Sequence, residues 1–162
     1  MMDITLNLND EERPVMIGIG ETLLEILRRL GYVGVKHGCE DGSCGVCTVL
    51  LDGQPVHSCV LLAAQVNGRK VTTIEGLGTY DHPHPLQTVF VEAGAVQCGY
   101  CTPAMILAAK ALLGQNPYPN EIEVREALSG VLCRCTGYLK PVEAVLRAAD
   151  LLAEEMHYVK TI

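Results

Sequence analysis

The feature that most constrains this 162-residue chain is its eight cysteines, which fall into two separate sets of four. The first set is Cys39, Cys44, Cys47 and Cys59, and the second set is Cys98, Cys101, Cys133 and Cys135. Disulfides would suit an exported protein, but the N-terminus MMDITLNLND lacks the positive and apolar segments of a secretory signal. We therefore expect a cytoplasmic chain with reduced thiols, and metal binding is the favoured role for them.

Composition excludes two further classes of protein. The formal net charge is −7 and no basic block is present, which argues against a nucleic-acid partner. No apolar run approaches the ~20 residues that cross a bilayer, so we expect no membrane span. With 49% hydrophobic residues, the chain can bury a core in one ordinary domain or two small ones.

Residues 1–76 are predicted to form a small sheet crossed by one helix. Alternating apolar residues indicate strands over 3–9 and 12–19. A helix is expected over 22–31, with Thr22 as N-cap and Glu25 completing a capping box. An Asp-Gly turn within 48–57 indicates a hairpin, and 70–76 adds a further strand.

The pattern changes to helices after residues 77–85, whose Gly, Pro and polar content is typical of a linker with exposed His82 and His84. The region 86–162 forms the second unit, and Gly114 and Gly130 are expected to end two of its helices. The four predicted helices cover 85–97, 103–114, 120–130 and 141–156. The fold class is therefore α+β.

The first cysteine set has the spacing C-x4-C-x2-C-x11-C. Three closely spaced cysteines and a remote fourth are typical of a plant-type [2Fe–2S] site. Gly38, Gly42 and Gly45 would let this loop curl tightly and turn backbone N–H groups toward an anionic cluster. A structural zinc site is the alternative, although zinc usually pairs two short C-x2–4-C knuckles.

The second set combines C-x2-C in QCGYCTP with C-x-C in LCRCTGY. Each motif precedes a predicted helix start, where the partial positive charge of the helix favours thiolates. The spacing alone leaves a cluster, a zinc ion and a redox dithiol open.

Three segments together resemble the small iron–sulfur subunit of the molybdenum hydroxylases. They are GCEDGSCGVCTV with HSC, QCGYCTPAMI and LCRCTGYLKPVEAV. The resemblance extends over almost the whole chain. That family includes xanthine dehydrogenase, aldehyde oxidoreductase and aerobic carbon monoxide dehydrogenase. The departures are mild: Val46 stands where the family more usually has alanine, and no ligand position is affected.

The resemblance implies an N-terminal β-grasp domain of the plant-type ferredoxin kind and a C-terminal four-helix bundle, each holding one [2Fe–2S] cluster. It further implies an electron relay between molybdopterin on a large subunit and FAD on a medium subunit, in a dimer of heterotrimers. Gln97 and Cys135 would approach the pterin, and the substrate would be transformed on another subunit.

The resemblance leaves the substrate open among purines, N-heterocycles, aldehydes, carbon monoxide and aromatic CoA thioesters. Two other hypotheses are a free-standing two-cluster ferredoxin and a structural zinc protein.

Overall fold

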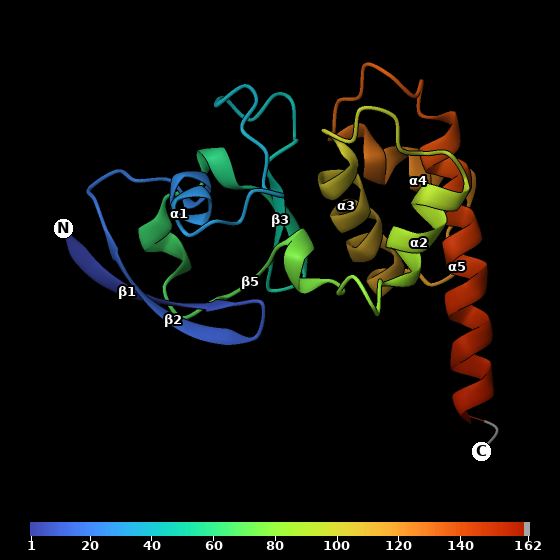
Figure 1. The fold of residues 1–162 in the computed structure, drawn as a ribbon, viewed down its shortest axis with the longest axis horizontal. Helices are drawn as coiled ribbons and strands as arrows, with labels where there is room; N and C mark the ends of the chain where they lie inside the picture. Colours follow the sequence, from blue (N-terminus) through green and yellow to red (C-terminus); the bar gives the residue numbers. More distant parts are fainter. Residues whose placement is uncertain (161–162) are drawn as a thin grey trace.

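The computed structural model describes residues 1–160, with side chains through Glu154, and consists of two units lying side by side. Within residues 1–160, the β unit contains the strands, the first α-helix and the short 3-10 helices Ser58–Val60, Ala63–Val66 and Ile74–Gly76, and the helical unit contains the other α-helices (Figure 1). The elements of the β unit are β1 (Met2–Leu8), β2 (Glu11–Ile17), α1 (Leu23–Arg29), β3 (Thr48–Leu51), β4 (Gln54–His57) and β5 (Lys70–Thr72).

The five strands form one sheet in the order β2-β1-β5-β3-β4. The pair β1 and β5 is parallel, and every other neighbouring pair in the sheet is antiparallel. This order, with α1 between the two hairpins in sequence, is the β-grasp arrangement that the resemblance implied.

Local sequence explains the turns and the start of α1. Asp52 and Gly53, between β3 and β4, both have positive φ, as a two-residue I′ hairpin turn requires. Thr22 caps α1: the Glu25 N–H donates to its Oγ1 over 3.3 Å, and its own N–H donates to the Glu25 carboxylate over 2.7 Å. The predicted capping box is confirmed.

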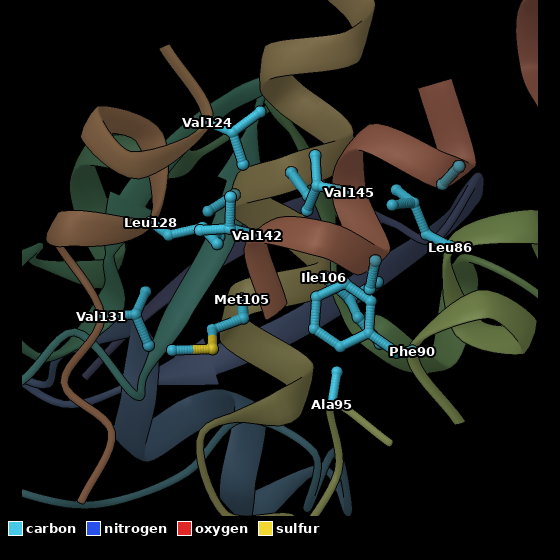
Figure 2. Close-up of a cluster of buried hydrophobic side chains, with 14 of the residues drawn as sticks. Leu86, Phe90, Ala95, Met105, Ile106, Val124, Leu128, Val131, Val142 and Val145 are labelled. Atoms are coloured by element: carbon cyan, nitrogen blue, oxygen red, sulfur yellow. The ribbon is translucent and has the colours of Figure 1, made fainter. Parts of the chain in front are cut away.

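The helical unit contains α2 (Pro85–Glu92), α3 (Thr102–Gln115), α4 (Glu121–Ser129) and α5 (Leu139–Lys160). Figure 2 shows its core, in which Phe90 of α2 and Met105 of α3 lie among aliphatic side chains from α4 and α5. The mixed α+β class with four packed helices is as expected.

Three sequence-based details of the helical unit were wrong. Helix α2 ends at Glu92 rather than residue 97, because Gly94 has a φ of +68° and turns the chain. Gly114 lies inside α3 and not at its end. The start of α5 at Leu139 is two residues earlier than expected.

The exposure predicted for the linker histidines holds only for His82. His84 is partly buried and caps α2, since its Nδ1 accepts a hydrogen bond of 3.2 Å from the Leu86 N–H. Its side chain therefore belongs to the helix start.

The two units are packed against each other through β3 and α3. Leu50 of β3 is buried with Leu107 and Ala111 of α3, and Ile74 packs beside them. The two units therefore share a small buried apolar contact and are packed together.

The cysteine-bearing loops gather along one edge of the molecule, at the top of Figure 1. They are the loop before β3, the loop between α2 and α3, and the loop between α4 and α5. Cys59 lies outside these loops, on the 3-10 helix Ser58–Val60 that follows β4. The start of β1 and the far end of α5 lie away from that edge. Within residues 1–160, no helix has the length and apolar character needed to cross a membrane.

Candidate iron–sulfur sites

The eight cysteines, all in the described part of the chain, are free thiols. In the first set, the backbone N–H of Cys44 points at the sulfur of Cys39 over 3.3 Å. Such N–H groups stabilise sulfur that carries negative charge, whether as a thiolate or as a cluster ligand.

The glycines of the first loop have distinct roles. Gly42 and Gly45 have φ values of +84° and +68°, so they make the tight curl that was predicted. At Gly38 a Cβ would lie 2.7 Å from the Cys44 sulfur, closer than ordinary contact allows. A side chain at this position would therefore collide with the Cys44 sulfur. Glycine at 38 leaves that sulfur free to bind a cluster.

Burial divides the first set into two kinds of thiol. Cys47 and Cys59 are buried, and burial raises the pKa of the Cys59 thiol to about 11, with a further contribution from the neighbouring Cys47. At the loop surface, a hydrogen bond with Asp41 acts to raise the pKa of Cys39, but bonds from Ser43 and from the Cys44 amide outweigh it and lower the pKa to about 7. Metal binding here would have to displace the proton of the buried Cys59 thiol.

The second set is assembled from three segments. Cys101 is buried at the N-cap position of α3, and its side chain contacts Cys133 in the α4–α5 loop. Burial raises the pKa of the Cys101 thiol to about 12, and the contact with Cys133 adds to the effect. Cys98 and Cys135 are exposed and contact each other, which raises the pKa of Cys135. The second set therefore consists of two contacting pairs, Cys101 with Cys133 deeper in the protein and Cys98 with Cys135 at the surface.

Cys133 is held by its own loop. The Thr136 hydroxyl donates to its sulfur over 3.1 Å, and the Tyr138 hydroxyl accepts the Cys133 N–H over 2.7 Å while donating to the Val131 carbonyl over 3.1 Å. No spacing rule identifies this role, because both hydrogen bonds depend on a left-handed residue, with Tyr138 at a φ of +65°.

Gln97 is exposed and immediately precedes Cys98, whose sulfur contacts Cys135. The two residues predicted to approach a pterin thus belong to one exposed region of the helical unit. That contact with a partner stays a prediction.

Each set thus offers four sulfur donors with backbone or hydroxyl donors beside them, a combination that suits iron–sulfur clusters. Among the residues that the structure describes, no three His, Cys, Asp or Glu side chains are drawn together around a single metal ion. The thiols of each set share one region of the molecule without forming a ready-made mononuclear site.

Family models and relatives agree on the kind of protein. The model for a 2Fe-2S iron-sulfur cluster binding domain matches residues 6–73, and the model for a [2Fe-2S] binding domain matches residues 73–146. The small FeS subunit of nicotinate dehydrogenase from Eubacterium barkeri is 50% identical over 151 residues, covering 93% of this chain and 96% of that one. The small subunit of nicotine 6-hydroxylase from Paenarthrobacter nicotinovorans is 47% identical over 148 residues, covering 91% and 89%.

Solved structures extend the likeness to the whole fold. Quinoline 2-oxidoreductase from Pseudomonas putida 86 matches with a TM-score of 0.90 at 40% identity, covering 95% of this chain and 96% of that one. The aldehyde oxidoreductase of Desulfovibrio desulfuricans matches with a TM-score of 0.93 at 42% identity, where this chain spans 18% of the longer polypeptide.

The fold and its thiols define an electron-transfer protein with two [2Fe–2S]-binding domains. More specifically, the chain belongs to the small iron–sulfur subunits of the molybdenum hydroxylase family. The expected family, fold and two [2Fe–2S] cofactors are confirmed, as is the role of an electron-transfer subunit in an oxidoreductase whose catalysis lies on other subunits.

Proposed function

We propose that this chain relays single electrons between molybdopterin on a large subunit and FAD on a medium subunit. The observation that carries the proposal is that the cysteine-bearing loops lie on one edge of the molecule, and that of the two cysteine sets only the second presents exposed cysteines, Cys98 and Cys135. A [2Fe–2S] cluster, when bound, accepts and releases one electron at a time.

The proposed ligands follow the two sets. Cys39, Cys44, Cys47 and Cys59 would hold the first cluster, and Cys98, Cys101, Cys133 and Cys135 would hold the second. Cys135 of the second set is exposed, and so is Gln97, which immediately precedes Cys98 of that set. These two residues are the ones through which a pterin on another polypeptide would be reached.

The finer points of assembly are part of the same proposal. We expect a dimer of heterotrimers in the cytoplasm, with residues 1–76 and 86–162 as the two cluster-binding domains and 77–85 as their connection. Two named relatives act on nicotinate and nicotine, and a matched structure is that of a quinoline oxidoreductase. These are nitrogen heterocycles, so an N-heterocyclic aromatic compound is the substrate we propose for the complex.

The test is to isolate the chain from its native host with whatever subunits accompany it. We expect two further polypeptides carrying molybdenum and flavin, and two iron atoms and two acid-labile sulfides at each of two sites. Turnover of a pyridine or quinoline carboxylate would support the substrate class. A lone chain would favour the free ferredoxin, and a colourless zinc protein would reject the relay.

Ligand assignment is tested in the same preparation with Cys44→Ser and Cys135→Ser. Each variant should disturb one of the two electron paramagnetic resonance signals and leave the other intact, so each serves as the control for the other. Equal loss of both signals in either variant would contradict two separate sites.

A further inference from the structure

The first cysteine loop, before β3, is hydrogen-bonded directly to the cysteine-bearing loop between α4 and α5, across the contact between the two units. The Leu132 N–H donates to the Cys44 carbonyl over 2.8 Å, and Leu132 is followed by Cys133. Cys44, a proposed ligand of the first cluster, is thus hydrogen-bonded to the residue next to Cys133, a proposed ligand of the second cluster.

A second bond joins the first cysteine loop to the loop between α2 and α3, which carries the other half of the second set. Tyr100, which lies between Cys98 and Cys101, donates its hydroxyl hydrogen to the His37 carbonyl over 2.6 Å. The Lys36 ammonium lies 6.0 Å from the centroid of the Tyr100 ring, at the outer range of a cation–π contact. Tyr100 therefore holds the start of the first cysteine loop against the loop between α2 and α3.

Gly45 allows this close approach. A Cβ built at Gly45 would lie 1.8 Å from the carbonyl oxygen of Gly130, which follows α4, and 3.1 Å from the Val131 Cα. Both obstacles are backbone atoms, which cannot rotate away as the end of a side chain can. Any side chain at 45 must therefore move the loop or separate the two units.

The residues on either side of Gly45 also engage the helical unit. Cys44 packs against the helical core, and Val46 is only 6% exposed within it. The segment 44–46 of the β unit is thus inserted into the other unit by a hydrogen bond, a backbone contact and a buried side chain.

We propose that Gly45 and Tyr100 are positioning residues that fix the separation of the two clusters and thereby set the rate of electron exchange between them. The step is the transfer of one electron, in which one cluster is oxidised as the other is reduced and no bond breaks. Electron transfer through protein slows steeply with distance, so a small displacement of one loop has a large effect. This inference rests on the proposed relay function.

The test compares two variants with two matched controls in the full chain carrying both clusters, within its complex where it has one. Gly45→Ala places a methyl group against the Gly130 backbone and so blocks the close approach of the first cysteine loop. Tyr100→Phe removes only the hydroxyl that bonds the His37 carbonyl. Gly68→Ala is the control for backbone strain, because Gly68 has a φ of +72° and nothing within 4 Å of a built Cβ. Tyr118→Phe is the control for the hydroxyl, because Tyr118 is 63% exposed.

Two readouts other than turnover are measured. The first is the magnetic splitting between the fully reduced clusters in electron paramagnetic resonance, which falls with the cube of their separation. The second is the hydrogen-exchange rate of the Leu132 amide. We expect a smaller splitting and exchange faster by about fivefold in Tyr100→Phe and about tenfold in Gly45→Ala, with both controls like the wild type.

The outcomes separate this inference from the relay proposal. If the wild-type protein lacks two clusters, the relay fails, whereas the Leu132 exchange rates still show whether the contact exists. If Tyr100→Phe and Gly45→Ala keep both clusters with unchanged splitting and exchange, the positioning role is overturned. If Gly45→Ala does not assemble the first cluster, Tyr100→Phe alone decides, since its change lies outside that loop.

Discussion

Tyr138 helps to order the cysteine-bearing loop between α4 and α5 through its hydroxyl group. Its hydroxyl is the partner of both the Cys133 N–H and the Val131 carbonyl, so one oxygen satisfies two backbone groups. Removing that oxygen leaves a partly buried donor and acceptor without their partner, which costs more than an average hydrogen bond contributes.

Tyr138→Phe is therefore expected to lower the free energy of unfolding by about 1–3 kcal/mol and to alter the second cluster's electron paramagnetic resonance signal while sparing the first. Urea unfolding of the loaded protein gives the stability. Tyr80→Phe is the control, because Tyr80 is 99% exposed. Wild-type stability with an unchanged spectrum would mean that the hydroxyl does not brace the loop.

His84 makes the start of α2 sensitive to pH. Burial and the nearby Lys110 charge lower the pKa of His84 to about 4, from an ordinary value of 6.5. The unfolded chain then takes up the proton as the pH falls through 6.5, and the folded chain does so only near 4. The stability due to neutral His84 is complete above pH 6.5 and is lost as the pH falls toward 4.

We expect His84→Asn to remove this part of the pH dependence, since asparagine also caps helices but does not titrate. Between pH 7 and pH 5 the wild type should lose about 1 kcal/mol more than the variant, a value reduced for solvent screening at a partly exposed group. Urea unfolding at the two pH values measures the difference. His82→Asn, at an exposed position, should behave like the wild type, and equal slopes for all three proteins would contradict the role of His84.

At the scale of elements, the ends of helices were predicted less well than their existence. The apolar pattern of the α2 region continues through Ala95 and Val96, so it favours a longer helix. The structure ends α2 with a Schellman arrangement, in which the Ala95 N–H reaches the Phe90 carbonyl and the Gly94 N–H reaches the Val91 carbonyl. Gly94 makes the turn possible, while Gly114 is an ordinary helical residue.

Replacing the two glycines by alanine should have opposite effects. Gly94→Ala forces a side chain into a φ of +68° and should destabilise by about 1–2 kcal/mol. Gly114→Ala meets nothing within 4 Å and gains helix propensity, so it should stabilise by about 0.5–1 kcal/mol. Thermal unfolding of both variants measures the signs, and the same sign for both would contradict these assignments of the helix end.

What the sequence predicted well depends on near neighbours in the chain. The hairpin turn at Asp52-Gly53, the cap at Thr22 and the glycine curl of the first loop are all local. Gly45 was predicted only as a flexible turn residue, because its contact with Gly130 joins distant segments. The hydrogen bond from Tyr100 to His37 is equally invisible in a single sequence, since no spacing rule connects them.

At the scale of the whole molecule, β3 and α3 join the two cores. All four residues of β3 are buried: Val49 and Leu51 face the core of the β unit, and Leu50 faces α3. A strand covered on both faces reads as a continuous apolar run, as Val49, Leu50 and Leu51 do. At β3 the sheet is therefore covered on both faces, by the core of the β unit and by α3, whereas β1 and β2 leave alternate residues exposed.

The direction in which α5 leaves the molecule bears on how such a protein can be built into a larger one. This helix runs away from the edge that carries the cysteine loops, and β1 starts elsewhere in the β unit (Figure 1). A polypeptide joined after α5 would not have to cross that edge. The same scaffold can thus serve as a separate subunit, as in the quinoline oxidoreductase match, or as one part of a longer gene product, as in the aldehyde oxidoreductase.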